Sequence, residues 1–409
     1  MRSSAWLLAA LLSSACGGAP SPQPAAQRLP PAPAPAQPRV VPVVPVAPAP
    51  ASASDPGCAA TLAYFGAVRS AAGQAAPDLG TLRTAYHDTA LQRLVQSSDA
   101  ATGRSDDATV TAAIAATGPG AFVAAEYALH AALSQWMRHN LKLAAEDKDA
   151  GKRAAAWSAA RCAWEQDLRP LALALQSRSG ELSSETGSED ATIAAQIDAA
   201  FAAGAAAVAA TPVDERALLP AHETAEKTWF RVVHRELAAA ASKARADADV
   251  VAARRAAGLF QMLRDRLQDR NTPGIALVEA QLAGDPAKID AAAVLREVDV
   301  ALVKRARKYC SHALDAKLTT TPLGLASVAE GAAYTRAFLP GMRAALTAKK
   351  FDAAAHLATW QAFAEAVEHG DDADELKKLS EELVHWNCAY QQALGIRECT
   401  ASADEQPAK

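Results

Sequence analysis

Apolar residues recur along most of this chain at the spacing of an α-helix. Between residues 295 and 309 they stand at Leu295, Val298, Leu302, Ala306 and Tyr309, which places them near one face of a helix. No run of alternating Val, Ile or Tyr bounded by turn residues predicts a strand. The pattern therefore predicts an all-α fold.

Polar and proline residues mark where these helices begin. A hydroxyl or carboxylate accepts free amide hydrogens at a helix start, and proline fits the first helical turn. Pro340 falls inside a predicted helix, where it frees a carbonyl and bends the axis, and such a kink can line a groove. The predicted starts are Ser105-Asp106-Asp107, Ser188-Glu189-Asp190, Thr272-Pro273, Asp285-Pro286 and Thr321-Pro322.

Part of the helical pattern is repeated. The segment SDDATVTAAIAA at 105–116 matches SEDATIAAQIDA at 188–199, and the triplet at 136–138 (WMR) is echoed at 229–231 (WFR). A period of about 80–93 residues is longer than a two-helix repeat, so each unit holds several helices. Residues 57–400 are therefore predicted to form a duplicated helical bundle or an irregular α-helical repeat domain.

Composition agrees with this fold and limits the partners. Alanine dominates the 57–400 segment, and it loses no side-chain entropy in a helix. The formal net charge is −4, which argues against nucleic acid as a partner. One basic run, at 304–308 (KRARK), is interpreted as a solvated helix face. Trp157 and Trp164 are seven residues apart, on one helix face, and are predicted to lie in the core.

The first 15 residues have the features of a secretory signal peptide. A basic start at Met1-Arg2 precedes the apolar run AWLLAALL, and small residues follow before position 16. The apolar run is shorter than the roughly 20 residues that a membrane-spanning helix needs. Residues 1–15 are therefore predicted to be removed on export.

A Pro/Ala/Val-rich segment follows at 16–56. Proline fixes φ and removes the amide donor, so this segment is predicted to be a disordered, extended tether that rises about 3.1 Å per residue. A second short disordered tail is predicted at 401–409.

The residues around Cys16 resemble the lipobox of bacterial lipoproteins. Ser14 and Ala15 fit that motif, whereas Ser13 stands where the family prefers a leucine-like residue. The resemblance implies that Cys16 carries a lipid, and Gly17, in place of an aspartate, implies the outer membrane. Simple cleavage after Ala15 is the alternative.

Five cysteines remain beyond Cys16. Cysteines pair in an oxidising compartment, and an odd number leaves one thiol free or paired outside the chain. Cys388 and Cys399 flank the end of the last helix and are predicted to form a disulfide. Cys162 and Cys310 lie in predicted helices, where the alternative to pairing is that they are buried small apolar residues.

Two acid–histidine pairs are the candidate metal ligands. Residues four apart lie on one helix face, which brings together Glu126 with His130 and His222 with Glu226. Carboxylate and imidazole ligands suit iron, zinc or manganese. Surface pairing without a metal is the alternative, and no cofactor is firmly indicated.

One family has a similar architecture. Exported helical iron-uptake proteins of the imelysin type share the location, the size and the duplicated bundle, but their G-x-H-x-x-E motif is absent here. The similarity therefore transfers no site residue. The chain also lacks the nucleophile-elbow, Walker and HExxH motifs, so no enzyme is predicted.

The expected function is a non-catalytic binding or scaffolding role in the cell envelope. The expected partners are the membrane, through the anchor, and another envelope protein or a small ligand. Metal binding in iron uptake is the alternative.

Overall fold

The described part of the chain is predominantly helical. The computed structural model describes residues 58, 78–178, 193–315, 317–370 and 372–401. These residues form helices joined by turns, without strands, which confirms the all-α prediction. Within these ranges every helix is too short or too polar to cross a membrane. The predicted signal peptide, Cys16 and the 16–56 tether lie outside the described residues, as does the tail from 402 onward.

The elements follow one another along the described ranges, and residues 179–192, between α7 and α8, lie outside those ranges. Most are α-helices, and short π- and 3-10 segments lie between some of them. In chain order they are α2 (Leu79–Tyr86), α3 (Ala90–Thr102), α4 (Asp106–Ala115), α5 (Ala121–Glu146), α6 (Ala150–Ala163), η1 (Trp164–Leu168), α7 (Arg169–Arg178), α8 (Ile193–Ala209), α9 (Glu215–Asp247), α10 (Val250–Arg270), α11 (Thr272–Ala283), η2 (Pro286–Lys288), α12 (Ala291–His312), α13 (Pro322–Ala345), η3 (Thr347–Lys349), α14 (Ala353–His369) and α15 (Ala373–Ala393).

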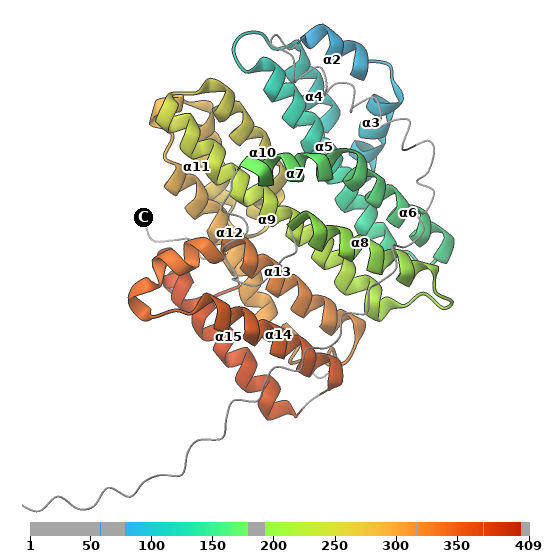
Figure 1. The fold of residues 1–409 in the computed structure, drawn as a ribbon, viewed down its shortest axis with the longest axis vertical. Coiled ribbons are helices and arrows are strands. Elements are labelled where there is room, and N and C mark those ends of the chain that lie inside the picture. Colours follow the sequence, from blue (N-terminus) through green and yellow to red (C-terminus); the bar gives the residue numbers. More distant parts are fainter. Residues whose placement is uncertain (1–57, 59–77, 179–192, 316, 371, 402–409) are drawn as a thin grey trace, which may run out of the picture. The chain divides into compact units, whose positions relative to one another are not determined.

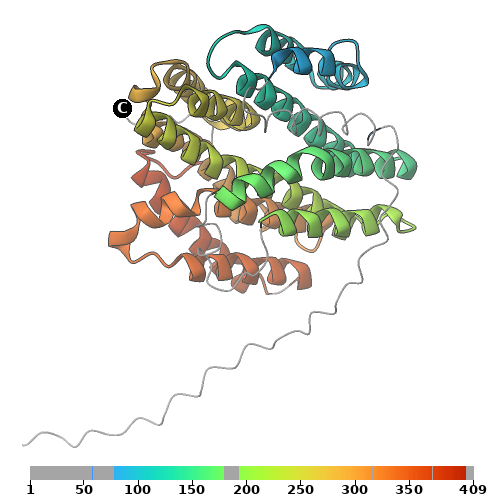
Figure 2. The same cartoon turned by 45° about the horizontal axis from the view of Figure 1, so that its top comes forward.

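Helix α9 is the element on which the others are assembled. It is 33 residues long and packs against α8, α10 and α13 (Figures 1 and 2). Helix α4 packs on α5 as α8 packs on α9. The repeated sequence segments therefore correspond to two helical hairpins, α4–α5 and α8–α9. The predicted start at 188–190 lies outside the described residues.

Two hydrophobic clusters hold the helices together. The larger runs from α5 to the residues after α15, and the smaller lies under α2, α3, α4 and α5. Trp157 and Trp164 are buried in the larger cluster, so the prediction that they belong to the core is confirmed. Their burial removes large apolar surfaces from water, which stabilises the packing of α6 and η1.

Some helix starts differ from the sequence prediction. Ser105 precedes α4 but makes no capping bond through its side chain. The carboxylate of Asp99, on α3, instead accepts the amides of Asp106 and Asp107, both at 2.8 Å. Thr321 does cap α13 as predicted, by accepting the amide of Gly324 at 3.2 Å. A cap supplied from another helix cannot be identified from local sequence.

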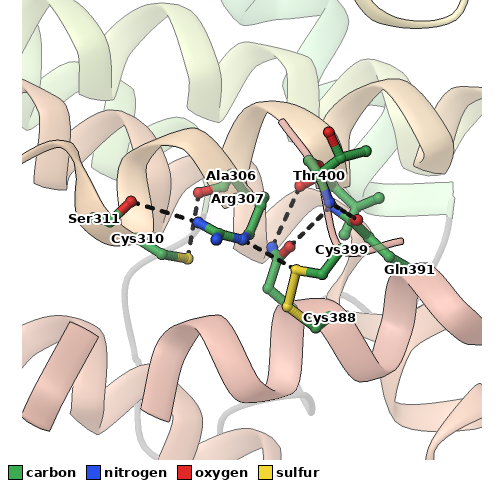
Figure 3. The surroundings of a disulfide bond; sticks show 10 residues. Ala306, Arg307, Cys310, Ser311, Cys388, Gln391, Cys399 and Thr400 are labelled. Atoms are coloured by element: carbon green, nitrogen blue, oxygen red, sulfur yellow. Dashed lines mark hydrogen bonds between the residues drawn. A yellow bond between two sulfur atoms is a disulfide. The ribbon is translucent and has the colours of Figure 1, made fainter. Parts of the chain in front are cut away.

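The basic run at 304–308 is not a solvated face, and that interpretation was wrong. Lys304 is fully buried in α12. The guanidinium of Arg305 bonds to Asp269 of α10. Arg307 donates through Nε to Cys399 Sγ at 3.1 Å (Figure 3). The run therefore connects α12 to α10 and to the chain after α15.

Two disulfides close the described structure. Cys388 and Cys399, the predicted pair, are bonded beside Gln391, whose side-chain amide bonds to the backbone of Thr400 (Figure 3). Cys162 is not a free apolar residue, because it is bonded to Cys58. Cys310 is buried and is the free thiol among the described cysteines.

Candidate functional site

The first predicted metal pair is part of a buried interhelical contact. His130 lies on α5 and is 1% exposed. Its Nδ1 is 2.9 Å from Asp167 Oδ2 of η1, whereas its Nε2 is 3.9 Å from Glu126 Oε1. The closer partner is thus Asp167, an acid 37 residues away in sequence. The His130–Asp167 pair connects α5 to η1.

The second predicted pair lies on α9 and includes a further acid. His222 Nε2 is 3.5 Å from Glu226 Oε2, and its Nδ1 is 3.4 Å from Glu223 Oε1. One ligand atom from each of these three side chains lies within 4.8 Å of the others. Glu223, which the sequence analysis did not select, therefore completes a three-residue group.

The two predicted pairs do not converge on one centre. Trp229 Nε1 donates to Ser134 Oγ at 2.8 Å, and Arg138 Nε donates to Glu226 Oε1 at 2.7 Å. These two bonds show that α5 and α9 are antiparallel, so His130 on α5 lies opposite the part of α9 near residue 233. That point is about 11 residues from His222, or roughly 16 Å at the rise of an α-helix.

The group on α9 is the centre of a buried ionic cluster, which comprises His222, Glu223, Glu226, Lys227, Arg138, Asp265 and Glu330. Lys227 Nζ contacts Glu226, and it lies 2.9 Å from Glu223 Oε2 and 3.7 Å from Glu330 Oε1 of α13. Arg138 on α5 bonds to Glu226 and, at 2.7 Å, to Asp265 of α10. The ionic cluster thus connects α5, α9, α10 and α13.

The charges in this cluster shift one another's protonation. Burial opposes ionisation of Glu226, but Lys227 and Arg138 outweigh it and hold the pKa of Glu226 well below its ordinary value. Burial likewise opposes the charge on Lys227, and the surrounding glutamates raise its pKa well above the ordinary value. The pKa of His222 is also raised, because Glu223 and Glu226 outweigh its desolvation.

These contacts restrict what the ionic cluster can bind. A metal ion between Glu223 and Glu226 would lie next to the Lys227 ammonium, which already pairs with both carboxylates. Two positive charges a few ångströms apart in a buried site repel each other strongly. In the form that the structure describes, the Lys227 ammonium therefore disfavours a metal ion at this position.

An apolar groove lies on another side of α9. Its volume is about 910 Å³, and residues of α8, α9, α13 and α14 line it. Its walls are mainly small side chains: Ala199, Ala200 and Ala203 from α8, Ala217, Ala221 and Thr224 from α9, Ala329, Ala332 and Ala333 from α13, and Ala364 from α14. A groove of this size is typical of small-molecule sites.

Two donors in the groove wall have no partner among the described residues. Arg336 of α13 is half-buried, and its guanidinium has neither a hydrogen bond nor an ion pair there. The indole N–H of Trp360 on α14 is buried and also lacks an acceptor in the described structure. A second arginine, Arg216, donates instead to the backbone carbonyls of Thr320 and Glu368. Arg336 is thus a positive charge in an apolar wall that no described residue compensates.

A second cavity, of about 770 Å³, is lined by another buried hydrogen-bonded set of side chains. Asp299 of α12 receives the hydroxyl of Tyr390 at 2.5 Å, and its other oxygen is 2.7 Å from His234 Nε2. Pro340, the predicted kink, lies inside α13 and lines this cavity together with Gly341. The side chains of His234, Asp299 and Tyr390 are thus bonded to one another.

Sequence reasoning found His130 and His222 but missed His234 and most of the partners of all three histidines. The i,i+4 rule finds His222 and Glu226, because both lie on α9. It cannot find Arg138, Asp265 or Glu330, which come from other helices. The alanine-rich helix faces were the only features of the sequence that pointed to the groove. Such faces do not by themselves indicate whether another helix packs on them.

Comparison with known protein families, with curated proteins and with solved structures finds no match to this chain.

Proposed function

We propose that this chain is a non-catalytic, lipid-anchored binding protein of the cell envelope. In this proposal Cys16 carries the anchor at the outer membrane, and the helical domain holds a ligand in the groove between α8, α9, α13 and α14. The observation that carries the proposal is the groove itself. It is about 910 Å³ in volume, apolar over most of its wall, and contains an arginine without a partner among the described residues.

The energetics favour a bound ligand in such a groove. Apolar surface left open to water costs about 25 cal/mol per Å², and a large concave apolar surface often marks a binding site. The groove lies between the α8–α9 hairpin and the later helices α13 and α14. A ligand there would contact both parts of the domain.

A groove-filling substitution tests the proposal. Ala332→Trp, on α13, places an indole in the groove, whereas Ala345→Trp fills the separate 770 Å³ cavity and is the matched control. Full-length protein would be purified without chelator or delipidation, and its small-molecule content measured by mass spectrometry. We expect a ligand in the wild type and in Ala345→Trp, and none in Ala332→Trp. The same molecule content in all three, or none in any, contradicts the proposal.

Metal binding is the second candidate, and the group His222, Glu223 and Glu226 supports it. One imidazole and two carboxylates within 4.8 Å of one another suit iron, zinc or manganese. In that role Lys227 would have to move away or lose its proton, and the raised pKa of Lys227 opposes the second route. This cost places metal binding second.

Metal analysis of the purified chain separates the two candidates. The protein would be isolated from the periplasm or membrane without chelator or histidine tag. Stoichiometric metal that disappears in His222→Ala but remains in His130→Ala would establish metal binding at the α9 group. Loss in His130→Ala alone would place it at the Glu126–His130 pair. Metal-free protein that shows no thermal shift on metal addition would rule it out.

A further inference from the structure

We propose that the groove binds a fatty acid, with the alkyl chain along the alanine-lined wall and the carboxylate at Arg336. This inference rests on the proposed binding function and names its ligand class. Three properties of the groove support it: its length, its volume and the position of its unpaired charge.

The groove is long because it follows α9 and α13, which lie side by side and run in the same direction. Arg216, near the start of α9, bonds to Thr320, just before α13. Further along, Lys227 is 3.7 Å from Glu330, and the rings of Phe230 and Tyr334 stack. The α13 side chains that line the groove run from residue 325 to residue 336, which spans roughly 16 Å at the rise of an α-helix.

The groove also has room for an alkyl chain. Its volume of about 910 Å³ extends over roughly 16 Å between walls of mainly small side chains. An extended alkyl chain fits, and the alanine and threonine methyl groups offer it continuous contact.

The charge distribution orients the ligand. At the end nearer the start of α9, Arg216 is exposed and bonded to carbonyls, beside the exposed Glu368. At the other end, Arg336 is half-buried, without an acid among the described residues. A guanidinium in an apolar wall is costly unless an anion pairs with it. Its planar donors match a carboxylate with two parallel hydrogen bonds, which places the acid head at Arg336.

Binding would be measured on a full-length Cys16→Ser chain, which lacks the proposed anchor and needs no detergent. The probes are dodecanoate and its uncharged analogue dodecanol, titrated by calorimetry. We expect the Cys16→Ser chain without further substitution to bind dodecanoate more tightly than dodecanol. Because a hydrogen bond to a charged group contributes about 1.5–3 kcal/mol, Arg336→Met should weaken dodecanoate binding roughly 10- to 150-fold. The same change should leave dodecanol affinity nearly unchanged, and Arg336→Lys should restore part of the difference.

Two further variants complete the design. Ala332→Trp should abolish binding of both probes, and Ala345→Trp should not alter it. Circular dichroism and thermal melting would verify that each variant is folded. The exposed Arg216→Met provides a matched arginine control at the opposite end, and it should change the preference for the carboxylate little.

The outcomes distinguish the ligand class from the binding function. Equal binding of dodecanoate and dodecanol, unaffected by Arg336→Met but abolished by Ala332→Trp, overturns the carboxylate and keeps the groove as a binding site. A different molecule that copurifies and is lost in Ala332→Trp overturns the fatty acid only. A dimer that Ala332→Trp dissociates would make a second copy of the chain the occupant. No ligand and no dimer would overturn both proposals.

Discussion

The ammonium group of Lys227 lies between the carboxylates of Glu223 and Glu226 and reaches toward Glu330 on α13. At the residue scale this arrangement opposes the entry of a metal ion between the histidine and glutamates of α9. The lysine is buried, so removing it leaves several acids in a site from which water is largely excluded. Breaking a buried ion pair in this way is strongly destabilising.

Lys227→Met should therefore lower the free energy of unfolding by about 3–5 kcal/mol, the cost of leaving buried charges unpaired. Urea unfolding followed by circular dichroism would measure it. Lys243→Met, on the same helix, is the matched control, because Lys243 pairs with Asp247 at an exposed position and should change stability little. Equal losses of unfolding free energy in the two variants would contradict the stabilising role of Lys227 in the ionic cluster.

His222 should make stability depend on pH. Its pKa is raised in the folded state, so its contribution is fully present below the unfolded pKa of about 6.5 and is lost as pH rises through the folded pKa. The melting temperature of the wild type should thus exceed that of His222→Gln most at about pH 5.5, and the difference should shrink toward about pH 8.

His139, in the cleft beside the cluster, supplies a control of opposite sign. Burial and the nearby Lys142 lower its pKa, so protonation below about pH 6.5 works against the folded state. The wild type should gain stability relative to His139→Gln as pH rises over the same range. Parallel pH profiles for the two variants would refute this assignment of charges.

At the element scale, glycines decide how closely helices approach. Gly204 of α8 lies against the ring of Trp157 on α6, where an added Cβ would be 1.9 Å from ring carbon Cζ2. The same tryptophan donates its indole N–H to the Phe201 carbonyl of α8 at 3.1 Å. The α6–α8 contact therefore depends on a glycine in the alanine-rich sequence of α8.

Gly204→Ala should consequently destabilise the protein by about 1–3 kcal/mol, since an extra methyl group in a packed core forces side chains or backbone to shift. Differential scanning calorimetry would measure the change. Gly151→Ala in α6 is the control, because its added methyl group meets only the exposed Asp149 carboxylate. If Gly204→Ala were as stable as Gly151→Ala, the close approach of α6 and α8 would be wrong.

At the scale of the whole molecule, the two disulfides constrain very different lengths of chain. Cys58 and Cys162 are 104 residues apart, whereas Cys388 and Cys399 are separated by 11. The entropy removed from the unfolded chain grows with the length of the closed loop. Cys310 takes no part in these bonds. Its burial raises the pKa of its thiol to about 12, so it is a poor nucleophile in the folded protein.

Replacing Cys58 and Cys162 by serine should lower the free energy of unfolding by about 4–5 kcal/mol. Replacing Cys388 and Cys399 by serine should lower it by about 3 kcal/mol or less, because the loop that this disulfide closes is shorter. Denaturant midpoints of the two double variants would test the order. A larger loss for the Cys388–Cys399 variant would show that local packing around Gln391 and Thr400 outweighs chain entropy there.

The sequence alone determined the local features of this protein. Helical spacing and alanine content predicted the fold class, Thr321 predicted the start of α13, and the seven-residue spacing of Trp157 and Trp164 predicted a buried face. These succeed because helix propensity, capping and amphipathic periodicity act within a few residues. The pairing of Cys388 with Cys399 belongs to the same class, since only one short segment separates them.

Tertiary structure decided the rest, because the remaining features join residues that are far apart in the chain. The local sequence around Lys304 indicates a solvated helix face, but α10 and the chain after α15 pack against that helix in the folded protein. Asp99 caps α4 from α3, and Cys162 finds its partner Cys58 across 104 positions. The groove is the clearest case. Each helix that lines the groove has an alanine-rich face of the kind that is usually buried in a core. Only the packing of the helices leaves these faces uncovered around Arg336.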